Sequence, residues 1–294
     1  MSASILVILR RIALAAGLAV LAACAGPDSA GRPALWEIAG PDGSAEGWLF
    51  GTIHALPEGT EWRTGVIDAA VAEADLLVVE AAGIADPAAT GREFAALAFD
   101  RSEGPLSARV APALRDELAA VLERAGAHRS RIERMESWAA ALALAGLAQA
   151  GSPENGVDRA LLAGFSGRRV VELEGVRGQL ALFDALPLRE QRDLLALAIA
   201  EAAAGPARGL RAAEHWRRGD LAALEAVASR GLLSDPQLRE ALLTARNRTF
   251  AVRVAALLEE RERPLVAVGA AHMLGDEGLP ALLERAGYRV RRLQ

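Results

Sequence analysis

Two short apolar runs, far apart in the chain, each end in the pattern Gly-x-x-His. The first reads WLFGTIH over residues 48–54, and the second reads VAVGAAH over residues 266–272. Short apolar runs closed by a glycine are typical of buried strands. The chain has four histidines, and these two patterns hold two of them. We therefore expect two strands of one sheet that deliver His54 and His272 from their carboxyl ends into a shared site.

The remaining sequence predicts further strands and many helices. Strands are expected at 34–38, 75–80, 168–173 and 288–293, and the turn residues at 40–44 predict a hairpin between the first two strands. Helical periodicity predicts helices at 64–73, 87–99, 111–125, 131–150, 158–165, 176–186, 188–203, 209–217, 221–228, 236–260 and 277–286. The expected fold class is α/β (α+β mixed), with a central mixed β-sheet of about six strands surrounded by helices and with helical insertions.

Composition supplies a core and excludes several kinds of site. Hydrophobic residues make up 52% of the chain and aromatic residues only 4%, so alanine and leucine must fill the core. Every basic residue is arginine, which excludes a Schiff-base lysine and the lysine of a P-loop. The net charge is −5 and the basic residues are dispersed, so nothing indicates a nucleic-acid partner. With Cys24 as the only cysteine, intramolecular disulfides and thiolate metal sites are impossible.

The N-terminus is typical of a targeting segment. Two arginines at 10 and 11 precede a short apolar run at 12–20, which is too short to span a membrane. The small residues before Cys24 resemble a bacterial lipoprotein cleavage box, in which the cysteine becomes the lipidated N-terminus. The alternative is an ordinary signal peptide cleaved after Ala23 or Ala25.

We therefore expect three parts: a lipoprotein signal peptide at 1–23, a flexible tether at 24–33 and a single domain at 34–294. Lipidation at Cys24 implies a membrane-anchored protein of the cell envelope. Alanine rather than aspartate after the cysteine favours the outer membrane, with the domain facing the periplasm.

A carboxylate at a third strand end completes a plausible site. Glu80 follows the apolar run of 75–79, so His54, His272 and Glu80 form a two-histidine, one-carboxylate set. Without thiolate ligands, manganese, cobalt, zinc or iron is the expected divalent metal. Such an ion supports hydrolysis by lowering the pKa of bound water from 15.7 to about 7. The alternative is that each histidine is a satisfied core or turn residue.

The chain resembles the TraB/GumN family of bacterial proteins, which is related to the animal Tiki proteins, over residues 35–293. The matching motifs are Leu35-Trp36-Glu37, Leu49-Phe50-Gly51-Thr52-Ile53-His54, Val78-Val79-Glu80, Gly156-Val157-Asp158, Val171-Glu172-Leu173-Glu174, Gln179-Leu180, Trp216-Arg217-Arg218-Gly219-Asp220, Arg246-Asn247, and Val268-Gly269-Ala270-Ala271-His272 with Gly275 and Gly278. The resemblance implies a metal-dependent protease activity like that of Tiki proteins. It also implies a fold similar to erythromycin esterases and to a haem-binding lipoprotein.

The resemblance assigns roles to individual residues. His54, Glu80 and His272 match the family's site positions, and Glu80 would bind metal or polarise water. Arg246 and Asn247 match its basic-amide pair: Arg246 would stabilise the charge of a tetrahedral intermediate, and Asn247 would orient the substrate carbonyl. The alternative for Arg246 is a salt bridge on a charged helix face.

Four more residues are expected to border a bound cofactor. Gly51 and Gly269 leave room for a close approach after each strand. Asp158 and Glu174 are second-line candidates, although Asp158 could simply cap a helix and Glu174 could face solvent. Gly175 follows Glu174 where the family more often has threonine, which places a local hydrogen bond in doubt.

Three functions remain open from the sequence. The first is a lipid-anchored, metal-dependent hydrolase acting on a peptide or a small amide or ester. The second is a lipoprotein that holds a metal or haem without turnover. The third is an inactive scaffold that keeps the motifs for folding.

Overall fold

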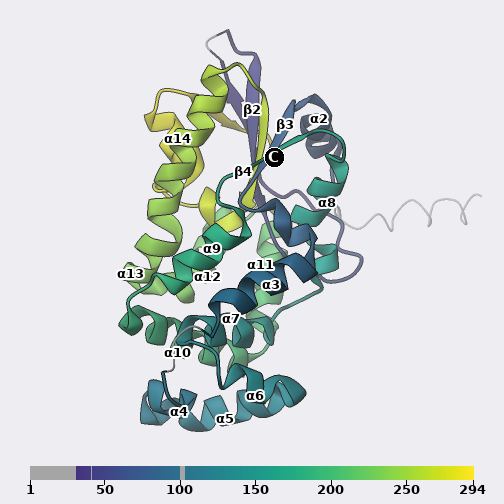
Figure 1. The fold of residues 1–294 in the computed structure, drawn as a ribbon. Coiled ribbons are helices and arrows are strands. Elements are labelled where there is room, and N and C mark those ends of the chain that lie inside the picture. The colour runs from purple at the N-terminus through teal and green to yellow at the C-terminus, as the bar shows by residue number, and fades with distance from the viewer. Residues whose placement is uncertain (1–30, 41, 100–102) are drawn as a thin grey trace, which may run out of the picture.

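A computed structural model describes residues 31–40, 42–99 and 103–294 (Figure 1). The expected signal peptide at 1–23, the lipidated Cys24 and most of the tether at 24–33 lie outside the described residues. The last tether residues contact the domain, because the backbone N–H of Arg32 donates to the carbonyl oxygen of Arg217 at 2.7 Å. None of the helices in the described part of the chain is both long and apolar enough to cross a bilayer.

A six-stranded mixed sheet forms the centre of the fold, as predicted. Its strands, in spatial order, are β4 (Arg169–Glu172), β3 (Leu76–Val79), β5 (Pro264–Gly269), β2 (Ala45–Thr52), β1 (Leu35–Ala39) and β6 (Arg289–Arg292). The first four are mutually parallel, whereas β1 runs antiparallel to both of its neighbours. The carboxyl ends of β2, β3 and β5 therefore lie at one edge of the sheet.

Strand β5 is the central element of this arrangement. It pairs with β2 on one side and β3 on the other, with Val268 opposite Gly51 and Ala267 opposite Val79. Its residues up to Val268 are all buried, which matches the continuous apolar run typical of parallel strands covered on both faces.

Helices cover both faces of the sheet and form a separate part beneath it in Figure 1. In chain order they are α2 (Gly65–Glu73), α3 (Pro87–Leu97), α4 (Leu106–Arg109), α5 (Arg115–Arg124), α6 (Arg129–Ile132), α7 (Ser137–Gly146), α8 (Val157–Gly164), α9 (Gly175–Asp184), α10 (Leu188–Ala204), α11 (Ala207–Arg217), α12 (Leu221–Ala228), α13 (Pro236–Arg239), α14 (Ala245–Glu259) and α15 (Leu279–Arg285).

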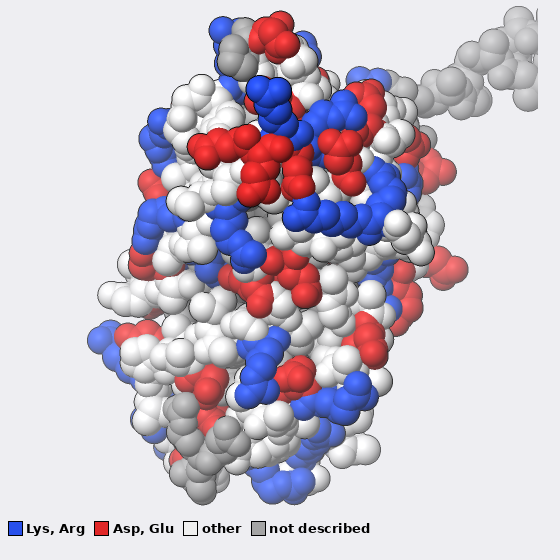
Figure 2. Space-filling view, turned by 45° about the horizontal axis from the view of Figure 1, so that its top comes forward, with Lys and Arg blue, Asp and Glu red and all other residues white. Residues whose placement is uncertain are grey.

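Three apolar cores hold these layers together. One lies between the sheet and α2, α8 and α11, where Phe50, Trp62 and Trp216 contact one another. A second lies between the other face and α14 and α15. The third is entirely helical and is built around α7 and α10, with Trp138 fully buried. On the face seen in Figure 2, acidic and basic side chains are interspersed.

Three details of the helices differ from the sequence prediction. The helix expected at 131–150 is broken into α6 and α7, because the N–H of Glu136 donates to the carbonyl oxygen of Ala98 at 2.9 Å instead of continuing a helix. The short helix α4 was not predicted. The stretch expected as one helix at 236–260 contains a π-helical turn, Glu240–Thr244, between α13 and α14.

Candidate functional site

Three side chains from separate strand ends meet around Gly269. His54 lies two residues after β2, Glu80 directly follows β3, and His272 lies in the short 3₁₀ turn after β5. A Cβ atom on Gly269 would lie 3.3 Å from Glu80 Oε1, 3.8 Å from His272 Cδ2 and 4.0 Å from His54 Nε2. The absence of a side chain at Gly269 therefore leaves the space between the three groups open.

The ring of His272 is held from behind by Asn247. Asn247 is fully buried, and its Nδ2 donates to the carbonyl oxygen of Glu277 at 2.6 Å. A carbonyl can only accept, so this bond fixes the amide orientation and directs Oδ1 to His272 Nδ1. Nδ1 must then carry the proton, and the unprotonated Nε2 lies 3.7 Å from Glu80 Oε1.

The ring of His54 is held in the same way by a carboxylate. Its Nδ1 contacts Asp158 Oδ2 at 2.8 Å, and Thr52 Oγ1 donates to the other carboxylate oxygen at 2.6 Å. Asp158 is buried, whereas the side chain of His54 is 62% exposed. The anchored Nδ1 leaves Nε2 of His54 on the side of Gly269 and the cavity.

Glycine at position 156 allows helix α8 to bring Asp158 to this place. A Cβ on Gly156 would lie 2.3 Å from the carbonyl oxygen of His54, closer than any real contact allows. The next residue, Val157, donates its N–H to the carbonyl oxygen of Ile53 at 3.0 Å. The first turn of α8 therefore packs directly on the backbone that carries His54.

Glu80 is surrounded by donors. Its Oε1 accepts the N–H of Gly269 at 2.7 Å, and its Oε2 accepts from Gln179 Nε2 at 2.7 Å and from Arg246 Nη2 at 2.5 Å. Arg246 also donates through Nε and Nη2 to the two oxygens of Glu174, each at 2.8 Å. The guanidinium thus joins the buried carboxylate of Glu80 to the partly buried carboxylate of Glu174.

A π-helical turn precedes Arg246 in the sequence. Nη1 of Arg246 donates to the carbonyl oxygen of Leu242, inside that turn, at 2.7 Å. All three guanidinium nitrogens are therefore engaged within the protein. A π turn inserts an extra residue into a helix and is common at functional sites.

Burial and neighbouring charges set the protonation states. Burial alone raises the pKa of Glu80, but the charges of His272 and Arg246 and the Gly269 N–H outweigh it and lower the pKa to about 2. Burial lowers the pKa of His272 to about 4, against the pull of Glu80. Partial desolvation by the surrounding protein opposes the charge on His54, yet the hydrogen bond and charge of Asp158 raise that pKa to about 9. At neutral pH, Glu80 is ionised, His272 is neutral and His54 carries a proton.

These residues open into a cavity of about 600 Å³ between the sheet edge and the helical part. His54, Glu80, Arg246, Gly269 and His272 form one wall. The rest of the lining comes from α9, α12 and the π turn, together with neighbouring segments. This volume lies within the range of about 300 to 1,000 Å³ that is typical of small-molecule sites.

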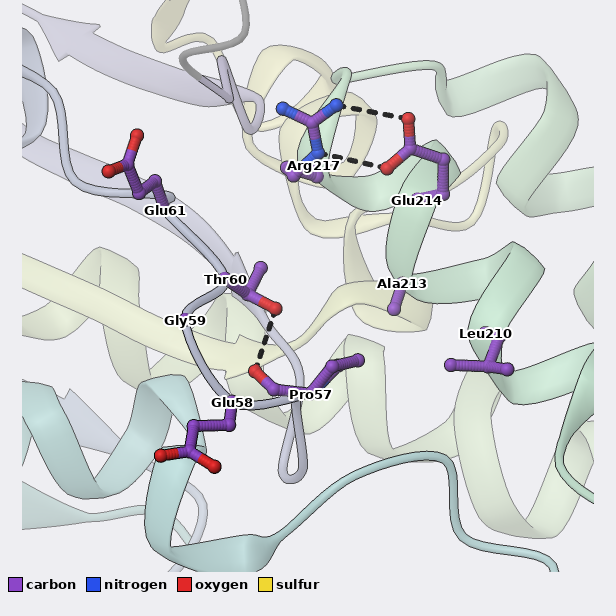
Figure 3. Close-up of a pocket in the computed structure, with 9 residues that line it drawn as sticks. All are labelled: Pro57, Glu58, Gly59, Thr60, Glu61, Leu210, Ala213, Glu214 and Arg217. Carbon is purple, nitrogen blue, oxygen red and sulfur yellow. Dashed lines mark hydrogen bonds and ion pairs between the residues drawn. The ribbon is translucent and has the colours of Figure 1, made fainter.

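A second cleft, of about 390 Å³, lies between the 57–61 loop and α11 (Figure 3). Its charged pair, Glu214 and Arg217, is closed on itself by hydrogen bonds of 2.9 and 3.0 Å. In Figure 3 the carboxylates of Glu58 and Glu61 point away from α11. This cleft contains none of the predicted site residues.

The expected site residues fall into two groups. His54, Glu80, Arg246, Gly269 and His272 line the cavity, whereas Asp158, Glu174 and Asn247 stand behind them as hydrogen-bond partners.

Gly51 lies outside that cavity. A Cβ at Gly51 would lie 3.0 Å from Ala270 Cα. The carbonyl oxygen of Gly51 accepts a hydrogen bond from Trp216 Nε1 at 2.7 Å. Gly51 therefore allows the turn after β5 to pack closely on β2. Two contributors were not predicted as site residues: Gln179, which the sequence showed only within a family motif, and Thr52.

The donor atoms suit a divalent ion in type and in ring orientation. Both imidazoles are anchored at Nδ1 by an oxygen, as metal-ligating histidines usually are, so Nε2 is the nitrogen that each could offer to an ion once unprotonated. The separation of 3.7 Å between His272 Nε2 and Glu80 Oε1 suits two ligands of one ion. Within the described residues, however, no three His, Cys, Asp or Glu side chains are close enough as they stand to hold an ion.

Comparison with known proteins identifies one family. A profile of the TraB/PrgY/gumN family matches residues 34–292, nearly the whole described domain. No curated protein and no solved structure matches the chain.

Proposed function

The chain belongs to the TraB/PrgY/gumN family, and we propose that it is a divalent-metal-dependent hydrolase of peptides or similar amides. One observation carries this proposal. Two imidazoles anchored at Nδ1 present Nε2 around Gly269, beside an ionised carboxylate and at the rim of a cavity of about 600 Å³.

His54, His272 and Glu80 would hold the ion, and manganese, cobalt, zinc or iron suits this donor set. When bound, the ion supplies a Lewis acid and a water of lowered pKa. Asp158 and Asn247 keep the two rings in the tautomer that leaves Nε2 available. His54 gives up the proton that it holds at neutral pH when it binds.

Arg246 and Asn247 receive roles that differ from the sequence expectation. The donors of Arg246 are already directed to Glu80, Glu174 and Leu242, so its role is to balance the charge of Glu80 and fix its orientation. Asn247 lies behind His272 rather than in the cavity, so it positions the ring instead of a substrate carbonyl.

A second candidate is a metal- or haem-binding lipoprotein without turnover. The ion pair between Arg246 and Glu80 favours it, because a carboxylate held by a guanidinium at 2.5 Å is a weaker base toward a metal-bound water. A stoichiometric metal or a visible haem band in protein that cleaves no peptide would establish this alternative.

The test combines metal analysis with a peptide library in manganese or cobalt. We expect one bound ion per chain and cleavage that is lost in His54→Ala and His272→Ala. Gly269→Ala should also lose cleavage, because its Cβ would lie 3.3 Å from Glu80 Oε1. Gly65→Ala is the matched control, since a Cβ there meets nothing within 4 Å. Equal turnover in the wild type and both histidine variants would remove the hydrolase proposal.

We further propose that Cys24 carries a lipid anchor in the cell envelope, at the outer membrane and facing the periplasm. The sequence Leu21-Ala22-Ala23 before the only cysteine of the chain, with its two small residues, supports this proposal. Metabolic labelling with a fatty acid should mark the wild type and not Cys24→Ser. Equal labelling of both proteins would contradict it.

A further inference from the structure

The cavity beside the proposed catalytic residues has two chemically different walls. The sheet-edge wall carries His54, Glu80, Arg246 and His272. The rest of the lining, here called the helical wall, is mostly apolar and includes Phe183, Leu224, Val227, Leu242 and Leu243. These residues come from α9, α12 and the π turn, which are separate in the sequence and converge only in the fold.

The charges at the sheet edge are already compensated within the protein. Arg246 donates hydrogen bonds to Glu80, Glu174 and the Leu242 carbonyl oxygen. Glu80 also accepts hydrogen bonds from Gly269 and Gln179. Among the described residues that line the cavity, the charged or titratable groups all belong to the sheet-edge wall.

A charged substrate group placed against the helical wall would thus lose its hydration and gain no ion pair there. Burying such a group without a partner is unfavourable because its charge stays uncompensated. An apolar group placed there is stabilised, because its surface is removed from water.

We propose that the helical wall is the specificity pocket of this site and binds an uncharged, apolar side chain or acyl group that flanks the scissile carbonyl. The cleavage of a bond next to this group rests on the proposed hydrolase function. The binding of an apolar group does not depend on that function. The substrate class is then a peptide or amide with a bulky aliphatic or aromatic group next to the cleaved bond.

The first test is binding of the uncharged dye Nile red to the purified chain, followed by its fluorescence. Val227→Trp fills the pocket and should weaken binding at least about tenfold, in line with the 10- to 200-fold effect of small changes in apolar pockets. Val252→Trp is the matched control, because Val252 is 71% exposed on α14 and should leave binding unchanged. Leu243→Trp is the second pocket variant, for use if Val227→Trp fails to fold.

The second test is the position-resolved preference of the peptide library. Leucine or phenylalanine beside the cleaved bond should be favoured about tenfold over aspartate, glutamate or arginine, and Val227→Trp should reduce this preference. A preference for a charged residue, or equal Nile red binding by the wild type and both pocket variants, would overturn the proposal. Nile red binding that is lost in the pocket variants without any peptide cleavage would uphold the apolar pocket and count against the hydrolase alone.

Discussion

Replacing Arg246 with methionine tests how the buried charges are balanced. The change keeps most of the side-chain stem and removes the guanidinium between Glu80 and Glu174, whose side chains are 10% and 13% exposed. Removing one partner of a buried ion pair costs about 3–5 kcal/mol, because the other charge stays buried.

The pH dependence of this loss has a definite sign. The folded-state pKa of Glu80 lies below its unfolded value, so the stabilisation is present above about pH 4.5 and is lost as the pH falls towards 2. His272 contributes most to lowering the pKa of Glu80 and Arg246 contributes next, so the variant loses the part of this stabilisation that comes from Arg246. The difference in the free energy of unfolding between wild type and Arg246→Met should therefore be about 3 kcal/mol at pH 7 and should shrink at pH 3.

Urea denaturation in the presence of a chelator measures both values. Arg248→Met is the matched control, since Arg248 lies two residues further on α14 and pairs with Glu240 where both side chains are half-exposed. Exposed pairs contribute little, so this control should stay close to the wild type. The reasoning fails if the two variants are equally stable at pH 7, or if the deficit of Arg246→Met is the same at pH 3 as at pH 7.

Two further changes test the supports of His54. Gly156→Ala should lower the free energy of unfolding by about 1–3 kcal/mol, as overpacking does, because its Cβ would lie 2.3 Å from the His54 carbonyl oxygen. Gly164→Ala on the same helix is the control and should be neutral, because a Cβ there meets nothing within 4 Å. Equal urea midpoints for the two variants would contradict this account. In chelator-treated protein, NMR titration should give a pKa of about 9 for His54 and about 4 for His272. Asp158→Asn should lower the pKa of His54, because it removes the charge next to the ring. Titration of both rings near 6.5 would refute the assigned environments.

The strands and their chemistry could be predicted because the signals are local. Runs such as 76–79 and 264–268 are apolar throughout and end in glycine or a charged residue, so each strand and its carboxyl end follow from a few neighbouring letters. Parallel pairing then brings His54, Glu80 and His272 to one edge.

The partners of these residues could not be predicted in the same way. Asp158 contacts His54 across 104 positions of the chain, and Arg246 contacts Glu80 across 166. Contacts between residues so far apart in the sequence produce no local pattern from which they could be predicted. Asp158 had the signature of a helix cap, and only the close approach allowed by Gly156 turns it towards an imidazole.

The helical part shows where local periodicity misleads. Residues 131–150 keep a helical pattern through the point at which the chain breaks to bond with Ala98, and residues 236–260 keep it through the π turn. In both places a tertiary contact overrides the local preference. The π turn also places Leu242 and Leu243 on the cavity wall, which the pattern alone did not indicate.

The central place of β5 has a consequence for folding. This strand separates β3 from β2, yet it is the second-last strand in the chain. Until residues 264–269 are in place, the folding chain holds two half-sheets whose facing edges have unpaired N–H and C=O groups, which makes folding slow and open to wrong strand pairing. A chain cut short before that point should be taken up by chaperones or proteases rather than persist as a partly working protein.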